Sequence, residues 1–526
     1  MSSAALPADT APPKRDADAP PERADLGAWL AVAAGSLGAL MATLDISIVN
    51  SALPVIQGEI GASGTEGTWI ATSYLVAEII IIPLAAWLER VLGLRTFLLI
   101  ASILFTGFSV VCGLSTSLGM MIVGRAGQGI TGGALIPTAM TIIATRLPPS
   151  QQPIGTAAFG GTAILGPVLG PIIGGWLTDN YSWHYAFFLN VPVCAGLVLL
   201  LLFGLKHEHL RLDQLRHADW FGIAGLAIGL GALTVMLEEG QREMWFESAM
   251  IVKLAIATVF GFALITIGQV RSAHPVLKLS LIFSRSFGSV FVLSLIIGVV
   301  LYGVTFLIPQ FLSSMADYSA LQSGKVVFVS GIPALMLMPF LPLAFKYLDV
   351  RLAVFVGMTL IGVSCAMDWH LTAQSAGGDL TGSQLVRGFG QIFAMMFLNQ
   401  AAISAVAPED AGDASALFNA GRNLGGSIGL AMMATLQDRQ TFLHFNRLGE
   451  TVSANAATTQ EWFAKAMAMP SGEAGAYRQL AGQLLEQSTV MAYNDLFFAL
   501  GVAIAVTTPL ALFLRPISSD TQMAMH

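Results

Sequence analysis

Three ionisable residues stand inside long apolar stretches of the sequence, where a charged side chain is costly. Asp45 lies in LDISIVNSALP, with no lysine or arginine within ten residues on either side. Glu78 lies in YLVAEIIIIPLAAWLE, and Arg125 lies in GRAGQGITGGALIP. We predict that the two acids bind protons or cations, and that Arg125 faces an acid or a carbonyl group inside the protein.

Proton exchange is chemistry that Asp45 can perform if its surroundings change. Desolvation raises the pKa of a carboxyl group, whereas a nearby arginine lowers it. A site that opens alternately to two aqueous phases shifts that balance, and so takes up and releases a proton. A structural interpretation stays open for each residue. Asp45 can form a fixed ion pair or a cap near Pro54, and Arg125 and Glu78 can act as structural partners only.

The elements that must position these residues are membrane helices. The chain of 526 residues is 55% hydrophobic and only 11% charged, with a mean hydropathy of +0.71. Soluble domains carry roughly 25% charged residues. The apolar runs recur at about 20 residues, the length with which a helix crosses the hydrocarbon of a bilayer. The fold class is therefore an all-α polytopic membrane protein.

Fourteen predicted spans place both termini on the same side of the membrane. The predicted inner segments hold fifteen lysines and arginines, whereas the short outer loops hold only Arg242 and Lys325. Because basic residues stay on the cytoplasmic side, both termini are predicted to be cytoplasmic. The spans are 27–50, 67–88, 96–115, 119–145, 155–178, 185–205, 219–237, 250–270, 287–312, 322–345, 351–371, 382–406, 412–436 and 490–514.

An internal repeat divides the spans into two halves. GRAGQGITGGALIPTAMTII (124–143) and VRGFGQIFAMMFLNQAAISA (386–405) share an early arginine followed by Gly and Gln, although apolar helices also resemble one another by chance. Paired halves are typical of alternating-access transporters, with the site between them. The predicted parts are a disordered cytoplasmic tail (1–26), an N-terminal six-helix bundle (27–205), a cytoplasmic linker (206–218), an inserted two-helix hairpin (219–270), a C-terminal six-helix bundle (286–515) with an outer loop (437–489), and a tail (516–526).

Three motifs carry a resemblance to a known family. LDISIVNSALP, GRAGQGITGGALIP and GPVLGPIIGG, in this order, resemble signature motifs of the major facilitator superfamily. With fourteen spans, the chain resembles its drug:proton antiporter branch of the EmrB/QacA type, over residues 27–515. The resemblance implies two six-helix bundles plus two extra central helices. It also implies a part in proton coupling for Asp45 and for Arg125, which occupies the position of the family's span-four arginine.

The third motif makes physical sense as a helix contact. Its glycines at i, i+4 and i+8 lie on one helix face and allow another helix to approach closely. Its prolines remove backbone donors and can kink the span. Tight packing alone is one interpretation, whereas the resemblance implies an exporter motif that biases the direction of transport. The motif comprises Gly166, Pro167, Gly170, Pro171, Gly174 and Gly175.

Polar and aromatic residues at membrane depth are candidates for a substrate cavity. Met and aromatic surfaces suit promiscuous binding, whereas polar side chains can equally serve as interhelical hydrogen-bond partners and aromatic ones can face lipid. The predicted cavity residues are Trp69, Tyr74, Gln128, Phe306, Gln310, Gln391, Met395, Asn399, Asn419 and Arg422. Further candidates are Phe311, Arg387, Gln400, Phe418 and Asn423.

One loop departs from the family pattern. AWLERVLGLR (86–95) keeps Gly93 and Arg95, but Arg90 stands where the family has an aspartate, after Glu89. The gating salt bridge normally assigned to that aspartate is therefore in doubt here. His184 likewise stands where an arginine is frequent.

The function that follows is proton-coupled export of hydrophobic or amphiphilic compounds by alternating access. The alternative is a dedicated exporter of one metabolite, lipid or fatty acid. No phosphate-binding loop, nucleophile elbow or metal-spaced histidine set is found, so we expect no enzyme, no cofactor beyond the proton gradient, no metal and no nucleic-acid partner. The resemblance further implies the inner membrane, a periplasmic adaptor and an outer-membrane channel, with a solvated hairpin or docking surface in 437–489.

Overall fold

The computed structural model describes residues 23–62, 64–206, 208, 210–211, 213, 218–272, 275–452, 455–467 and 472–514. The regular structure in these ranges is helical throughout, without a strand. This confirms the predicted all-α class. The predicted tails, apart from residues 23–26, and most of the 206–218 linker lie outside the described residues.

The first half is a bundle built on six long or broken helices. Its span four is broken after Gly132 because Pro137 cannot donate a hydrogen bond to the carbonyl of Gly133. The elements are α1 (Leu26–Ile60), α2 (Gly64–Gly67), α3 (Trp69–Leu92), α4 (Leu94–Gly113), α5 (Leu118–Gly132), α6 (Leu135–Arg146), α7 (Gln152–Asn180), α8 (His184–Phe188) and α9 (Asn190–Gly204).

Two further helices, α10 (Trp220–Glu239) and α11 (Ala249–Arg271), precede the second half. In that half, prolines at 333, 339 and 342 divide one predicted span into short pieces. Its helices are α12 (Arg285–Ala316), α13 (Ala320–Phe328), α14 (Gly331–Leu337), α15 (Leu341–Tyr347), α16 (Val350–Asp368), α17 (Thr381–Ser404), α18 (Ala411–Thr451), α19 (Ala457–Met467) and α20 (Gly472–Thr507).

Each predicted span coincides with a helix or a broken helix. Ten of these segments are long and apolar enough to cross a membrane by length and composition. The other four predicted spans fall on α3, on α5 with α6, on α17 and on α18. These four hold Glu78, Arg125, Arg387 and Arg422. The number of fourteen crossings stays a prediction.

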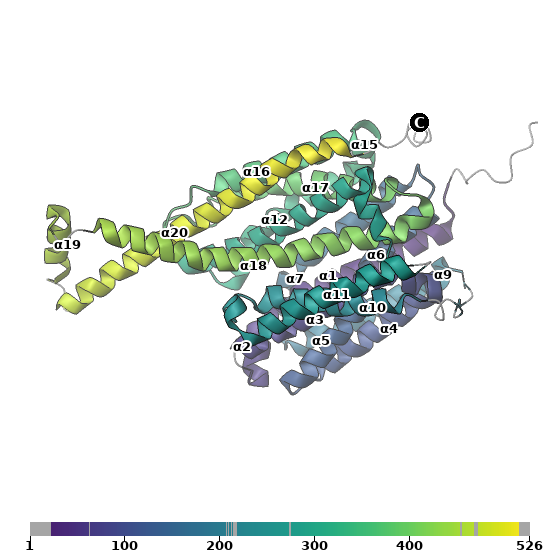
Figure 1. The fold of residues 1–526 in the computed structure, drawn as a ribbon, viewed down its shortest axis with the longest axis horizontal. Coiled ribbons are helices and arrows are strands. Elements are labelled where there is room, and N and C mark those ends of the chain that lie inside the picture. Colours follow the sequence, from purple (N-terminus) through teal and green to yellow (C-terminus); the bar gives the residue numbers. More distant parts are fainter. Residues whose placement is uncertain are drawn as a thin grey trace, which may run out of the picture.

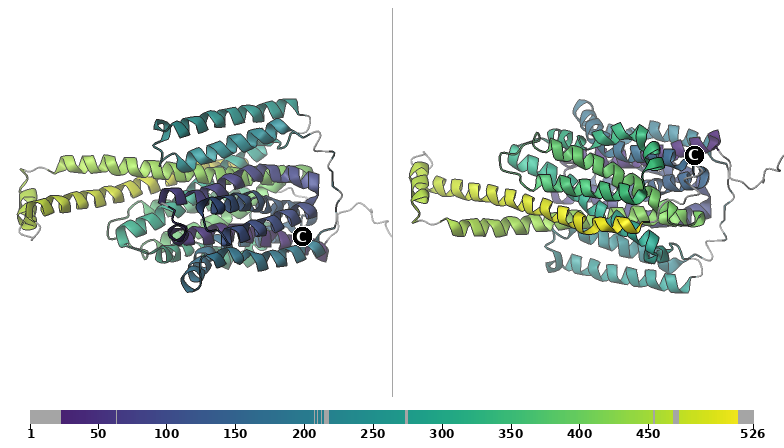
Figure 2. Two further views of the ribbon diagram at one scale, coloured as in Figure 1. Left: turned by 90° about the horizontal axis from the view of Figure 1, so that it is seen from below. Right: turned by 90° about the horizontal axis from the view of Figure 1, so that it is seen from above.

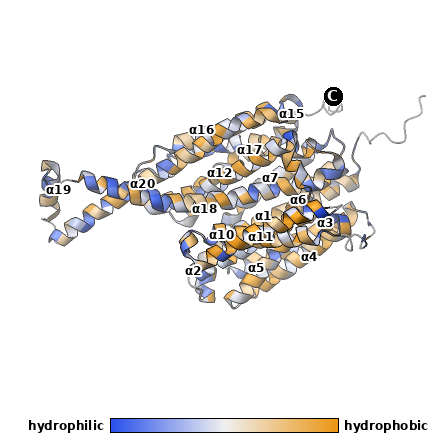
Figure 3. Cartoon of the chain, viewed as in Figure 1, coloured by the Kyte–Doolittle hydropathy of each residue, from blue (hydrophilic) through white to orange (hydrophobic). Residues whose placement is uncertain are grey.

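The bundle has two distinct ends (Figure 1). The helical part of the chain begins and ends at one of them, the termini end. From the other, the hairpin end, α18 and α20 project beyond the remaining helices and are joined by α19 (Figure 2). The projecting part is more hydrophilic than the apolar flank formed by α11 (Figure 3). The described parts of segment 437–489, predicted to form a solvated hairpin or a docking surface, extend α18 and α20, of 41 and 36 residues, and include the short helix α19.

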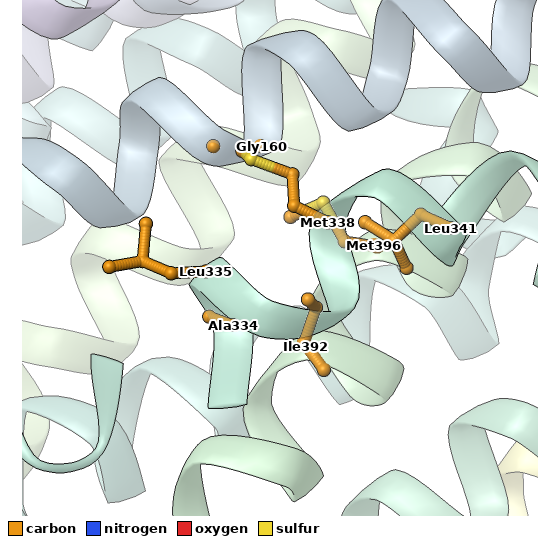
Figure 4. Close-up of a pocket in the computed structure, with 8 residues that line it drawn as sticks. Gly160, Ala334, Leu335, Met338, Leu341, Ile392 and Met396 are labelled. Carbon is orange, nitrogen blue, oxygen red and sulfur yellow. The ribbon is translucent and has the colours of Figure 1, made fainter. Parts of the chain in front are cut away.

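The inserted pair covers one seam between the halves. Helix α10 packs against α3 of the first half and α18 of the second, and α11 packs on α10. At the opposite seam, α7 faces α14, α15 and α17. There Met338 and Met396 lie against Gly160 and Gly161, in an apolar pocket without a polar side chain (Figure 4).

Candidate functional site

Asp45 and Arg125 form a buried ion pair in the first half. Nη1 of Arg125, on α5, lies 2.6 Å from Oδ2 of Asp45, on α1, and both side chains are almost wholly excluded from solvent. Arg125 thus faces an acid, one of the two kinds of partner predicted for it. Glycines on α5 allow it, because a Cβ at Gly124 or Gly129 would overlap α4 or α3.

Two amides complete the surroundings of the Asp45 carboxylate. Gln128, one turn after Arg125, donates to Oδ1 of Asp45 at 2.9 Å, and Asn190 of α9 donates to the same oxygen at 2.7 Å. Asn190 also donates to Ser109 at 2.9 Å. The carboxylate thus accepts three hydrogen bonds from three side chains. Asn190, in the stretch SWHYAFFLNVPV, was absent from the predicted site.

The aromatic ring of Tyr74 lies beside this pair. The guanidinium carbon of Arg125 is 4.3 Å from the ring centroid, and Nε of Arg125 donates to the carbonyl of Ile70 at 3.2 Å. Tyr74 is fully buried, and its hydroxyl has no hydrogen-bond partner among the described residues. Tyr74 and Gln128, predicted to line a substrate cavity, therefore contact the ion pair in this conformation.

Glu78 lies one turn beyond Tyr74 and reaches the other half. Asn423 of α18 donates to Oε1 of Glu78 at 3.3 Å, and only 3% of Glu78 is exposed. None of the ion pairs between described residues includes it. Helix α3 approaches span four closely here, because a Cβ at Gly133 would lie 2.8 Å from Cγ of Glu78. The two predicted acids thus occupy different settings, one ion-paired within a half and one hydrogen-bonded between the halves.

The glycine motif of α7 holds α1, the helix of Asp45. Side chains at Gly166, Gly170 and Gly174 would overlap α1, where Thr43, Ser47 and Ser51 supply small residues at the same spacing. Ser47 also donates to the carbonyl of Pro167 at 3.2 Å. That carbonyl has no helical donor because Pro171 lacks an N–H. Gly175 faces open space, so it takes no part in this contact.

Comparisons with known proteins agree with these features. A profile of the Major Facilitator Superfamily matches residues 35–430. The chain is 32% identical to the colistin resistance protein EmrB of Acinetobacter baumannii, over 93% of this chain and 96% of that protein. It is also 32% identical to the multidrug export protein EmrB of Escherichia coli, over 91% and 94%. The human organic anion transporter MFSD10 superposes with a TM-score of 0.57 at 16% identity, covering 92% of this chain and 100% of that one.

The chain belongs to the major facilitator superfamily. The resemblance drawn from the three motifs is thereby confirmed, and so is the major facilitator fold. As a member of this superfamily the protein is a multi-pass membrane transporter and not an enzyme.

Some of the residues predicted to line the substrate cavity are buried, and others are partly or largely exposed. Asn399 and Asn419 are buried, and Asn419 donates to the carbonyl of Ser415 at 2.9 Å. Phe311 packs edge-on against Tyr493 and Phe418 is fully buried, so these two rings belong to the core. Partly or largely exposed are Trp69, Phe306, Gln310, Gln391, Met395 and Arg422.

The second half has its own buried ion pair. Arg387, which corresponds to Arg125 in the repeat, lies 2.6 Å from Asp368 of α16, and its Nε donates to Ser364 at 3.2 Å. The acid here comes from span eleven, whereas in the first half it comes from span one. Within the predicted internal repeat, the arginine therefore recurs but its acidic partner differs.

Arg90, the departure from the superfamily loop pattern, bridges the halves at the termini end. Its Nη1 lies 3.2 and 3.3 Å from the two carboxylate oxygens of Asp413, at the start of α18. Its Nη2 donates to the carbonyl of Val276 at 3.1 Å. The loop thus contributes the cation and α18 the acid. Nearby, Ser415 of α18 donates to the carbonyl of Pro137 at 2.9 Å.

Reversing the charge at position 90 tests this contact. We expect Arg90→Asp to slow transport about tenfold, because it places a second acid beside the buried Asp413. The effect is smaller than that of breaking a fully buried ion pair, because Arg90 is partly exposed. The double variant Arg90→Asp/Asp413→Arg restores the pairing and recovers most of the rate. Transport in vesicles measures both. Equal defects in the single and double variants would show that the charges do not act on one another.

Proposed function

We propose that this protein is a proton-coupled exporter of hydrophobic or amphiphilic compounds that works by alternating access. The observation that carries the proposal is the pairing of Asp45 with Arg125 in one half, together with the hydrogen bond that Asn423 of the other half donates to Glu78. The relatives named for multidrug export and colistin resistance support the same class of activity.

Protonation gives each acid a distinct effect. A proton on Asp45 removes the charge that Arg125 binds, which leaves the buried guanidinium with its bond to Oε1 of Gln128 at 3.0 Å but without a counterion. A proton on Glu78 changes the hydrogen bond with Asn423, which joins α3 of the first half to α18 of the second. Local proton binding is thereby linked to the relative position of the two halves. The proton gradient supplies the free energy, and no cofactor is required.

The protein is proposed to lie in the inner membrane with the termini end in the cytoplasm. The basic residues support this orientation, since Arg90, Arg95, Arg146 and Lys278 all lie toward that end. The contacts of Asp413 with Arg90 and of Ser415 with Pro137 join the halves there too. An exporter with this side closed presents its central site toward the hairpin end.

Transport by the purified protein tests the proposal. Proteoliposomes with an imposed pH gradient are loaded with a panel of lipophilic cations, anions and fatty acids. We expect movement of several unrelated lipophilic compounds, accompanied by opposite proton flux and abolished by collapsing the gradient. Transport of one compound only, a fatty acid for example, would favour the dedicated exporter. Transport that ignores the gradient would refute proton coupling.

A periplasmic adaptor and an outer-membrane channel are the proposed partners in a host with two membranes. The projecting ends of α18 and α20 with α19 offer an adaptor a surface well beyond the bilayer (Figure 1). We expect replacement of residues 450–475 by a short Gly/Ser turn to abolish resistance in cells while transport in proteoliposomes stays within about twofold of the wild type, because the central site is untouched. Unchanged resistance would exclude docking at that tip.

A further inference from the structure

The inserted helix α10 brings a carboxyl group against α18 of the second half. Glu238 lies in the last turn of α10 and accepts a hydrogen bond from Ser427 of α18 at 3.2 Å. An acid on a lipid-facing insert has no structural need to point at the bundle, and a carboxyl group in such a place is costly. The insert therefore does more than cover the seam.

Glu238 and Glu78 contact the same face of α18. Ser427 follows Asn423 by one helical turn, and Asn423 is the residue that donates to Glu78 at 3.3 Å. The two acids come from different helices, α10 and α3, and are separated along α18 by about 6 Å of helix rise. Glu238 lies on the side of Glu78 that is nearer the hairpin end, because α18 runs from the termini end toward the hairpin.

Other polar side chains lie near these two acids, and some of them have buried atoms without a hydrogen-bond partner among the described residues. Tyr302 of α12 packs on α18, since a Cβ at Gly426 would lie 2.9 Å from its ring. Nε of Arg422 and Oδ1 of Asn423 are buried without a hydrogen-bond partner among the described residues. So is the hydroxyl of the fully buried Tyr74, one turn from Glu78 and beside Arg125. Buried polar groups normally find partners, so such orphaned atoms mark places for water or a migrating proton.

The hairpin-end turn after α10 connects Glu238 with water. Glu239 pairs with Arg242 at 2.8 Å, and the partly exposed Glu243 lies 3.6 Å from the same arginine. The charged and titratable groups that face Glu238 are Glu239 on its own helix and Tyr302 of α12, while Ser427 faces it from α18. The electrostatic influence of Arg422 falls on Glu78 and Tyr302.

We propose that Glu238 is a second proton-binding carboxyl group, which receives protons from the hairpin-end solution and passes them to Glu78. The hydroxyl of Tyr74 continues the line from Glu78 toward the Asp45–Arg125 pair. The inserted hairpin thus supplies the entry step of the proton route. This inference rests on the proposed proton-coupled export and names a site within it.

The test measures proton-driven export in oriented proteoliposomes as the pH on the hairpin side is raised. We expect Glu238→Gln to slow export about tenfold at pH 8, where protons are scarce and a positioned carboxyl group matters most, and far less at pH 6. Binding of substrate stays unchanged. Glu238→Asp, which keeps the carboxyl group, recovers part of the rate. Glu247→Gln, an exposed acid in the same hairpin, keeps the wild-type pH profile.

The possible results distinguish failure of the Glu238 inference from failure of the proposed proton-coupled export. A wild-type pH profile in Glu238→Gln, with proton-coupled transport intact in the wild type, overturns this inference and leaves the proposed function standing. A wild type that moves substrate without protons overturns the proposed function itself. If Glu238→Gln does not fold, infrared spectroscopy of the wild type and of Ser427→Ala provides the test. A carboxyl band that titrates in the wild type and is shifted in Ser427→Ala supports the proposed site. A band that is not shifted by the loss of the serine rejects it.

Discussion

Asp45→Asn is expected to reduce proton-driven export at least about 100-fold, the scale on which a positioned proton-transfer group contributes. Asparagine keeps the shape of the side chain but cannot carry the proton or the charge that Arg125 binds at 2.6 Å. The variant also leaves a guanidinium buried without its counterion, and breaking a buried ion pair in this way costs about 3–5 kcal/mol. Export is measured in proteoliposomes under a fixed pH gradient, and stability by thermal unfolding in detergent.

Loss of stability has to be separated from loss of coupling. The double variant Asp45→Asn/Arg125→Gln removes both charges, so it should regain most of the stability while export stays absent. Asn190→Ala serves as the matched control, because it removes one hydrogen bond to Asp45 and keeps the ion pair. Export that returns in the double variant together with stability would show that the pair is structural only.

The ion pair could be predicted because membrane burial makes single charges costly. Asp45 and Arg125 each stand alone in apolar sequence, so each needs the other or an equivalent partner. The two amides that share Asp45 could not be assigned in the same way. An asparagine or glutamine in a membrane helix satisfies many neighbours equally well, and only helix rotation decides that Gln128 and Asn190 meet this carboxylate.

Contacts between the halves were beyond prediction for a related reason. Arg90 and Asp413 are 323 residues apart and lie at loop edges, where charged residues are ordinarily solvated. The bond from Asn423 to Glu78 likewise depends on how the halves sit against each other. A sequence repeat predicts two similar bundles, but it carries no information on which residues face across the seam.

The long helices of the projecting hairpin did have a sequence signal. Between Gly429 and Gly449 the chain contains neither glycine nor proline, and it is rich in Leu, Ala, Met, Gln and Arg. Such a composition favours one uninterrupted helix, and α18 indeed continues to Thr451. The polar residues after position 436 suggested that the helix ends at the membrane surface. Exposure to solvent does not end a helix, however, when its residues favour helical structure.

The glycine face of α7 is the part of the site most sensitive to added volume. A side chain at Gly170 would overlap Ser47 of α1, two residues after Asp45. We expect Gly170→Leu to destabilise the protein by about 1–3 kcal/mol or more, because overpacking forces helices apart. Export is expected to be lost as well, since a displaced α1 moves Asp45 away from Arg125.

Gly175 provides the matched comparison within the same helix. It has no heavy atom within 4 Å of the position that a Cβ would occupy. Gly175→Leu makes the same chemical change and should keep export within about twofold, as substitutions away from packed contacts do. If both variants lose export equally, glycine matters for the flexibility of α7. If only Gly170→Leu loses export, the motif acts through its contact with α1, the helix that carries Asp45. The glycine motif and the proton site are then parts of one helix–helix contact.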